Sequence, residues 1–302
     1  MGSKVFGRQF HPRTCCVTAS PGRRSNNESV PASSKPQNAG PPKKGSVPPA
    51  PAATSPIGGS GDEQQQLERL RSLRRLANQL SVAAAEAERN SLLQQMQAAA
   101  RAMASENLAV LGSVGATLLQ TMAAFIDKLS ENPPWVLAVN ARTLEDAAEL
   151  LLRIAETPAA AKNPSTPLRA LAVDDEPDVL MTLDYSLDLA KIAHDSVATP
   201  GAAMELAGRV AYDLFVLDVM LPQMDGFELC EKLRGSSQHK ETPALFVTGA
   251  EGFQPRLKTA QLGRSDFIAK PFLPAELGLR SLIQSLCRRY NYRSGAPGRG
   301  GR

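Results

Sequence analysis

The chain has 302 residues, of which 42% are hydrophobic and 21% are charged, a balance typical of soluble globular protein. Its length suggests about two domains, but 23 Pro, 22 Gly and only 5% aromatic residues indicate that part of it does not pack into a core. The 61 N-terminal residues carry eight Lys or Arg and one Glu, and residues 288–302 carry five Arg, so the residues between them have a net charge of −8. An acidic middle argues against a folded nucleic-acid-binding domain.

The four cysteines do not form a metal-binding or disulfide pattern. Cys15 and Cys16 are adjacent, whereas Cys230 and Cys287 are isolated. Because no CxxC spacing occurs, we expect reduced thiols and a cytoplasmic protein. The N-terminus also lacks the apolar core of a secretory signal.

Residues 1–61 are rich in Pro, Ser, Gly and Lys and form a basic arm. Such a segment cannot bury enough apolar surface to offset the entropy of ordering it, so we predict that it is disordered. The arm carries no firm signal for nucleic acid or membrane, and a solvated linker is the favoured interpretation.

Residues 62–132 contain no proline and are dominated by Ala, Leu, Gln, Glu and Arg, which favour helix. Apolar residues three and four apart form a heptad-like seam. They are Leu67, Leu70, Leu73, Ala77, Leu80, Ala84 and Ala87. A helical hairpin and a coiled coil between two copies of the chain both fit this pattern, and we favour self-association as a homodimer. Gly112 and Gly115 predict a bend or a break.

The sequence disfavours two other interpretations of this helical region. The stretch Leu108–Ile126 is uncharged, but its Ser, Thr and Gln residues favour a bundle helix over a membrane span. A histidine phosphotransfer bundle needs a helical histidine, and residues 12–193 contain none.

Residues 133–166 begin with two prolines and end in a Pro-rich linker. Between them, residues 143–155 predict an amphipathic helix with Thr143 as its N-terminal cap and Asp146 as the carboxylate of its first turn.

From residue 167 to residue 290 short apolar runs alternate with helical patterns, and a flexible Gly/Arg tail follows at 291–302. Five such units predict an α/β domain with a doubly wound, five-stranded parallel sheet. We expect its strands at residues 171–173, 193–198, 214–217, 244–247 and 267–269.

Charged and polar residues follow four of these strands. Asp174 and Asp175 follow the first, Asp218 the third, Thr248 the fourth and Lys270 the fifth. Because ligands gather at the carboxyl ends of parallel strands, we expect these side chains to meet at one edge of the sheet. Three carboxylates repel one another, which favours a hard cation such as Mg²⁺ among them. A carboxylate beside a divalent cation can form an aspartyl phosphate, and Lys270 and Thr248 suit a phosphoryl group.

Four sequence pieces in this region resemble the receiver domain of two-component response regulators. They are VDDEP at 173–177, LDVMLPQMDGFEL at 217–229, VTGA at 247–250 and IAKPF at 268–272. The intervals also agree, with 44 residues from Asp174 to Asp218, 30 more to Thr248 and 22 more to Lys270. The resemblance implies a flavodoxin-like sheet with strand order 2-1-3-4-5, and it covers only residues 168–290 or so.

The resemblance also implies a role for each site residue. Asp218 looks like the phosphoacceptor, and Asp174, Asp175 and the backbone carbonyl of Met220 would join it in holding Mg²⁺. Thr248 and Lys270 would contact the phosphoryl group, and Phe267 sits at the family's aromatic switch position. A cis peptide bond at Lys270-Pro271 and a histidine kinase or phosphotransfer protein as partner are expected as well.

The resemblance predicts a response regulator rather than an enzyme acting on a separate substrate, although a receiver can catalyse its own phosphorylation and dephosphorylation. In the leading hypothesis, phosphorylation controls self-association or partner docking through the N-terminal helices. A phosphate sink without output and a nucleic-acid-associated regulator using the basic termini are the alternatives.

Overall fold

The computed structural model describes residues 61–106, 108–131, 138–157, 166–249 and 265–292, so the predictions for the N-terminal arm and the C-terminal tail lie outside the described residues. The described residues all belong to one compact unit, Pro56–Arg302. Its N-terminal part, the helical region, consists of four helices. They are α1 (Gly61–Val82), α2 (Glu86–Ser105), α3 (Gly112–Glu131) and α4 (Ala138–Glu156).

The seam predicted on the first helix is covered within the chain. Leu70, Leu73, Ala77 and Leu80 are buried on α1, which packs mainly against α4 and also against α2. The structure therefore has a four-helix arrangement in which residues 62–132 supply three helices, rather than one hairpin or one long coiled coil. The predicted break is confirmed, because α3 begins at Gly112, whose φ of 60° is unfavourable for other residues.

The fourth helix begins earlier than predicted. α4 starts at Ala138, so Thr143 lies inside it and the predicted N-terminal cap is wrong. The Thr143 hydroxyl instead donates a hydrogen bond to the Val139 carbonyl oxygen, at 3.1 Å, which is how a mid-helix Thr satisfies its side chain. Asp146 accordingly lies near the middle of the helix rather than in its first turn.

The second part, the α/β region, contains a five-stranded parallel sheet of order β2-β1-β3-β4-β5, as predicted. The strands β3 and β4 are buried along their whole length, as central strands of a parallel sheet are. The bounds are β1 (Arg169–Val173), β2 (Ala193–Val197), β3 (Leu214–Asp218), β4 (Ala244–Thr248) and β5 (Ser265–Ala269).

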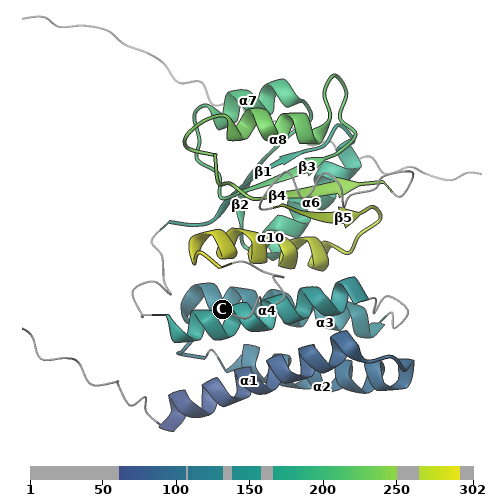
Figure 1. Cartoon of the computed structure of the whole chain (residues 1–302), viewed down its shortest axis with the longest axis vertical. Coiled ribbons are helices and arrows are strands. Elements are labelled where there is room, and N and C mark those ends of the chain that lie inside the picture. Colours follow the sequence, from purple (N-terminus) through teal and green to yellow (C-terminus); the bar gives the residue numbers. More distant parts are fainter. Residues whose placement is uncertain (1–60, 107, 132–137, 158–165, 250–264, 293–302) are drawn as a thin grey trace, which may run out of the picture. The chain divides into compact units, whose positions relative to one another are not determined.

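Helices cover both faces of this sheet (Figure 1). One face is covered by α7 (Pro200–Ala207) and α8 (Gly226–Arg234), and the other by α6 (Pro177–Leu189) and α10 (Pro274–Arg289). Successive side chains of a strand point to opposite faces. Phe215 and Leu217 of β3 therefore join the α7/α8 core, whereas Leu214 and Val216 join the α6/α10 core.

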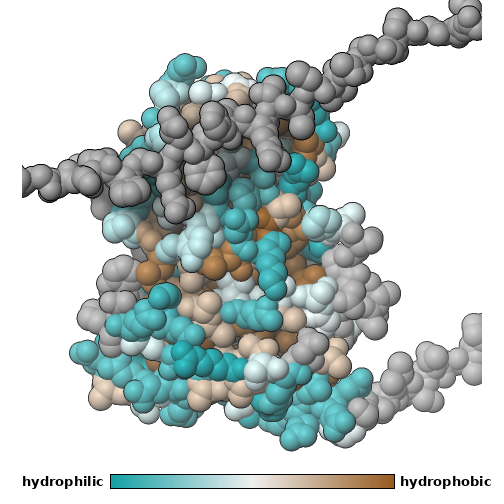
Figure 2. All heavy atoms as spheres, turned by 180° about the vertical axis from the view of Figure 1, so that it is seen from behind, coloured by the Kyte–Doolittle hydropathy of each residue, from teal (hydrophilic) through white to brown (hydrophobic). Residues whose placement is uncertain are grey.

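The core on the α6/α10 side continues into the helical region. The helix α10 contacts α6, the sheet, α3 and α4, so that apolar residues of both regions form a single core. In Figure 1 the pair α3 and α4 lies between α10 and the outer pair α1 and α2. Seen from behind in Figure 2, apolar surface is visible at mid-height, around the level where the two regions meet. In the described ranges no helix has the length and apolar character needed to cross a membrane.

Candidate functional site

The strand order brings the predicted site residues to one edge of the sheet. Asp218 and Thr248 are the last residues of β3 and β4, and Asp174 and Lys270 directly follow β1 and β5. These four strands are consecutive in the sheet, with Asp218 paired to Val247 and Thr248 paired to Ala269. Four apolar strands therefore deliver polar side chains to one place, as the sequence predicted.

Lys270 is the centre of this cluster. Its Nζ lies 2.9 Å from Asp174 Oδ2, 3.0 Å from Asp218 Oδ1 and 3.1 Å from Glu176 Oε1. Its backbone N–H donates to the Thr248 carbonyl oxygen, at 2.7 Å, and the following peptide bond to Pro271 is cis, as expected. Burial by itself lowers the pKa of Lys270, but hydrogen bonds to the three carboxylates outweigh it and raise that pKa. The ammonium therefore stays charged.

The Asp218 carboxylate is 4% exposed and is oriented by two groups. Its Oδ1 faces Lys270, and its Oδ2 accepts a hydrogen bond from the backbone N–H of Met220, at 2.7 Å. The Met220 side chain is 76% exposed. The structure thus places the backbone of Met220 beside Asp218, while the role predicted for its carbonyl stays a prediction.

Asp174 is fully buried, and its Oδ1 accepts a hydrogen bond from the Glu176 backbone N–H at 3.0 Å. Burial raises the pKa of Asp174, and the nearby Asp218 adds to this, while Lys270 and the Glu176 N–H partly offset it. Asp175 is exposed and does not contact Lys270 in the described structure. Glu176, to which the sequence assigned no role, makes that contact instead, and the metal-binding role of Asp175 stays a prediction.

The loop after Asp218 requires a glycine at position 226. A Cβ on Gly226 would lie 2.1 Å from the backbone oxygen of Asp218, closer than any real contact. The helix α8 begins at this glycine, and the Asp225 carboxylate caps it by accepting from the Glu228 N–H, at 2.8 Å. The close approach of α8 holds the end of β3 in place.

Thr248 is the last residue of β4, and Phe267 lies in the neighbouring strand β5. The Thr248 hydroxyl is nearly buried and donates to the Gly249 carbonyl oxygen at 3.2 Å. The Phe267 ring stacks on Phe246 at 5.2 Å and lies 6.0 Å from Phe227, measured between ring centroids. Phe267 thus packs against the core on the α7/α8 side, and its switching role stays a prediction.

The donor set is suited to a hard divalent cation. Carboxylate oxygens of Asp174 and Asp218 converge within 3.0 Å of one cationic nitrogen, and Mg²⁺ typically binds one or two carboxylates and keeps several waters. Across the described ranges, no three acidic, His or Cys side chains are grouped as a complete metal cage. The residues present therefore fit a partly hydrated Mg²⁺ rather than an all-protein site.

Comparison with known proteins identifies this region. Residues 170–281 match the family model of the response regulator receiver domain, so the chain contains a receiver domain, as the four motifs predicted.

Similar proteins share this region. The transcriptional activator protein IrlR of Burkholderia pseudomallei is 38% identical over 122 residues, which cover 40% of this chain and 51% of the relative. The alkaline phosphatase synthesis transcriptional regulatory protein PhoP of Bacillus subtilis is 33% identical over 121 residues, which cover 40% of this chain and 49% of that protein. The chain therefore spans about half the length of the curated relatives it matches. A solved structure of the chemotaxis response regulator CheY4 of Vibrio cholerae is 29% identical with a TM-score of 0.36, covering 40% of this chain and 99% of that one.

Proposed function

We propose that Asp218 accepts a phosphoryl group from a histidine kinase or phosphotransfer protein, and that its phosphorylation is Mg²⁺-dependent. The proposal rests above all on the contact of Lys270 Nζ with Asp218 Oδ1 and Asp174 Oδ2, at 3.0 and 2.9 Å. A buried nucleophile, a second carboxylate and a fixed cation at one sheet edge are the parts that phosphoryl transfer to a carboxylate needs.

In the proposed step a carboxylate oxygen of Asp218 attacks the phosphorus, and the bond from phosphorus to the donor's imidazole nitrogen breaks. The electron pair of that bond leaves with the nitrogen, and an acyl phosphate forms on Asp218. Lys270 offsets the added negative charge, and the Thr248 hydroxyl is available to donate to a phosphoryl oxygen. Asp174 and Asp218 would hold a Mg²⁺, which when bound would supply further charge neutralisation.

Acetyl phosphate with Mg²⁺ tests this proposal, with intact mass as the readout. We expect wild type to gain one phosphoryl group and Asp218→Asn to gain none. Asp188→Asn is a matched control, because it makes the same substitution at an exposed carboxylate on α6 and should label like wild type. Equal labelling of wild type and Asp218→Asn, or no labelling of wild type, would contradict the assignment.

The surface that best suits the phosphodonor is α6. Met181, Tyr185 and Leu189 lie four residues apart on this helix and are 70%, 57% and 40% exposed. Apolar side chains at this spacing form one stripe that a partner helix can cover. The helix begins at Pro177, directly after Glu176, so the stripe leads away from the phosphorylation site. We infer that the donor protein docks along it.

The output of phosphorylation, in this proposal, passes through the helical region. The support is the packing of α3 and α4 on α10, the helix that follows Lys270. Partner docking is favoured over self-association, because the seam of α1 that would join two copies is buried against α4. Phosphorylation that hydrolyses rapidly and leaves the solvent exposure of α3, α4 and α10 unchanged would instead indicate a phosphate sink.

A further inference from the structure

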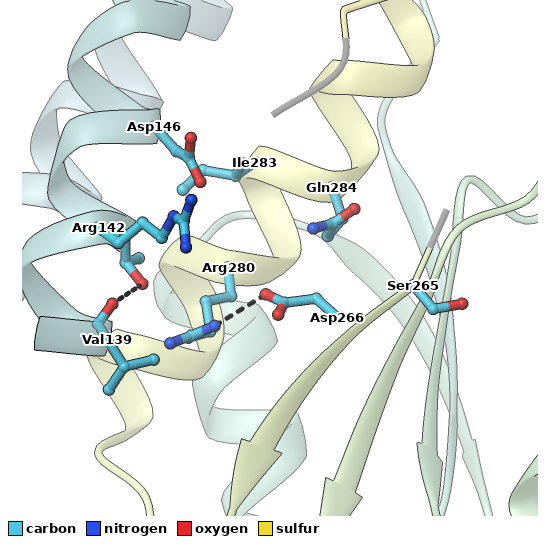
Figure 3. Close-up of a pocket in the computed structure, with 9 residues that line it drawn as sticks. Val139, Arg142, Asp146, Ser265, Asp266, Arg280, Ile283 and Gln284 are labelled. Carbon is cyan, nitrogen blue, oxygen red and sulfur yellow. Dashed lines mark hydrogen bonds and ion pairs between the residues drawn. The ribbon is translucent and has the colours of Figure 1, made fainter. Parts of the chain in front are cut away.

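A cavity of about 340 Å³ separates the helical region from the α/β region on one side of their contact (Figure 3). Its walls come from α4, from the first residues of β5 and from α10. They are Val139, Arg142, Thr143 and Asp146, then Ser265 and Asp266, then Arg280, Ile283 and Gln284. Several of these are charged, in contrast to the apolar core that α10 shares with the helical region. Polar groups at such a junction make its stability depend on their ionisation.

On the α10 side of the cavity, a buried arginine is paired with two carboxylates. Arg280 is 6% exposed and donates to Asp266 Oδ2, at 2.8 Å, and to Glu276 Oε1, at 3.1 Å. A buried cation with two anionic partners keeps its charge, since burial alone lowers the pKa of Arg280 but both carboxylates raise it. This cluster lies within the α/β region and does not need α4 to form.

The α4 side of the cavity presents a carboxyl group without such a partner. In Figure 3, Arg142 and Asp146 extend from α4 toward α10. Asp146 is half-buried, and within the described part of the chain it has no hydrogen-bond or ion-pair partner. Burial raises the pKa of Asp146 to about 6, with Asp266 and Glu145 adding to the rise and Arg142 and Arg280 opposing it.

We propose that the docking of α4 on α10 and β5 is a pH-sensitive contact, tight when the Asp146 carboxyl is protonated and loosened when it is ionised. Withdrawing α4 from the cavity would return Asp146 to water, where its pKa is near the ordinary 3.8. The docked state therefore binds the proton more tightly. Its extra stability is fully present below pH 3.8 and is lost as the pH rises through about 6.

Two other titratable groups near the cavity also have shifted pKa values. Burial raises the pKa of Glu276 as well, which acts in the same direction. Tyr292, which follows α10, has its pKa raised by burial to about 12 and stays neutral over this range. Glu276 keeps its ion pair with Arg280, whereas Asp146 has no such partner in the described ranges, so Asp146 is the group whose ionisation changes the contact between α4 and α10.

The thiol of Cys287 reports this docking. It is 4% exposed on α10, in the core that α10 shares with the helical region, whereas Cys230 is buried on the opposite side of the sheet. Labelling of the full-length protein with dithiodipyridine, mapped by peptide mass, measures both sites in one sample. Comparing wild type with Asp146→Asn at each pH cancels the intrinsic pH dependence of thiol reactivity.

We expect Cys287 to label about tenfold faster in wild type than in Asp146→Asn at pH 7.5, and equally fast at pH 3.5. The pKa shift sets an upper limit of roughly a hundredfold, which solvent screening of a partly exposed carboxyl reduces. Cys230 should label alike in both proteins. Glu156→Gln, which removes an exposed carboxylate near the end of the same helix, should behave as wild type does.

Arg142→Gln provides a second variant that leaves Asp146 in place. Removing the cation that lowers the pKa of Asp146 should move the midpoint of the Cys287 transition to higher pH. Cys287 labelling that is within twofold in wild type and Asp146→Asn at both pH values overturns the proposal. The proposal is also overturned if the midpoint of the Cys287 transition in Arg142→Gln is equal to or lower than that of wild type. Neither result depends on phosphorylation of Asp218.

Discussion

Two helices on the same face of the receiver sheet have opposite surroundings. The helix α10 is buried on nearly all sides, because α3 and α4 cover the surface that the sheet and α6 leave open. The helix α6 instead keeps Met181, Tyr185 and Leu189 in solvent. One surface of the receiver is thus used within the chain, and the neighbouring one remains available to another protein. The buried residues of α10 therefore stabilise the fold, whereas the exposed residues of α6 can be contacted by a partner protein.

The largest difference between the two helices should appear in the free energy of unfolding when a leucine is shortened to alanine. Leu286 of α10 is fully buried, and Leu286→Ala should lower the free energy of unfolding by about 3 kcal/mol. Leu189→Ala on α6, whose side chain is 40% exposed, should cost less than about 1 kcal/mol. Urea unfolding followed by circular dichroism measures both. Equal losses would show that α10 is not enclosed as described.

The contact between the two helices depends on a glycine. A Cβ at Gly278 of α10 would lie 2.7 Å from the Ser186 carbonyl oxygen of α6, so Gly278→Ala should force the helices apart and cost about 2 kcal/mol. The matched change Gly201→Ala meets nothing within 4 Å and should be neutral or slightly stabilising. Thermal unfolding of the pair tests this. A neutral Gly278→Ala would mean that the helices separate without loss.

The exposed stripe should matter for transfer and not for folding. Tyr185→Ser should change the free energy of unfolding by less than about 0.5 kcal/mol, because the ring is 57% exposed. The rate of phosphotransfer from the cognate kinase should nevertheless fall about tenfold, which is about 1.4 kcal/mol of lost interaction. Labelling by acetyl phosphate should be unchanged, since that donor needs no protein contact. Equal loss with both donors would place the defect at Asp218 instead.

The smallest expected loss of stability comes from a contact made just after the end of α10. The Arg153 guanidinium carbon lies 4.7 Å from the centre of the Tyr292 ring, which ties α4 to the residues after α10. Arg153→Ala should cost about 0.5 to 1 kcal/mol. Arg75→Ala on α1, which removes an exposed pair with Glu68, should cost still less. Chemical unfolding of the two variants, measured side by side, compares these costs, and a larger loss for Arg75→Ala would contradict the assignment.

Much of the receiver could be predicted from the sequence, because its signals are local. Each strand is a short apolar run that ends at a polar residue, as at Leu217-Asp218, and the bounds observed for the five strands differ from the expected ones by two residues at most. The carboxyl ends of parallel strands meet at one edge of the sheet. The sequence alone therefore places Asp174, Asp218, Thr248 and Lys270 together.

The helical region resisted prediction because its apolar pattern is compatible with several partners. The seam on α1 has the spacing of a coiled coil, but a helix of the same chain and a helix of a second copy satisfy it equally well. The start of α4 was misplaced since Thr143 resembles a cap, whereas its hydroxyl is satisfied inside the helix. Glu176 was also not assigned a role, because the sequence does not show which of the adjacent acidic residues contacts Lys270.

By itself the sequence determined that a receiver domain lies within residues 168–290, since the order and spacing of its motifs are properties of one chain segment. Only the tertiary structure decided that α4 covers α1 and that α3 and α4 cover α10. It alone also placed Asp146 in a cavity facing Asp266 and Arg280. The physical reason is that apolar burial is not directional, so the partner of a helix face is set by the packing of the whole chain.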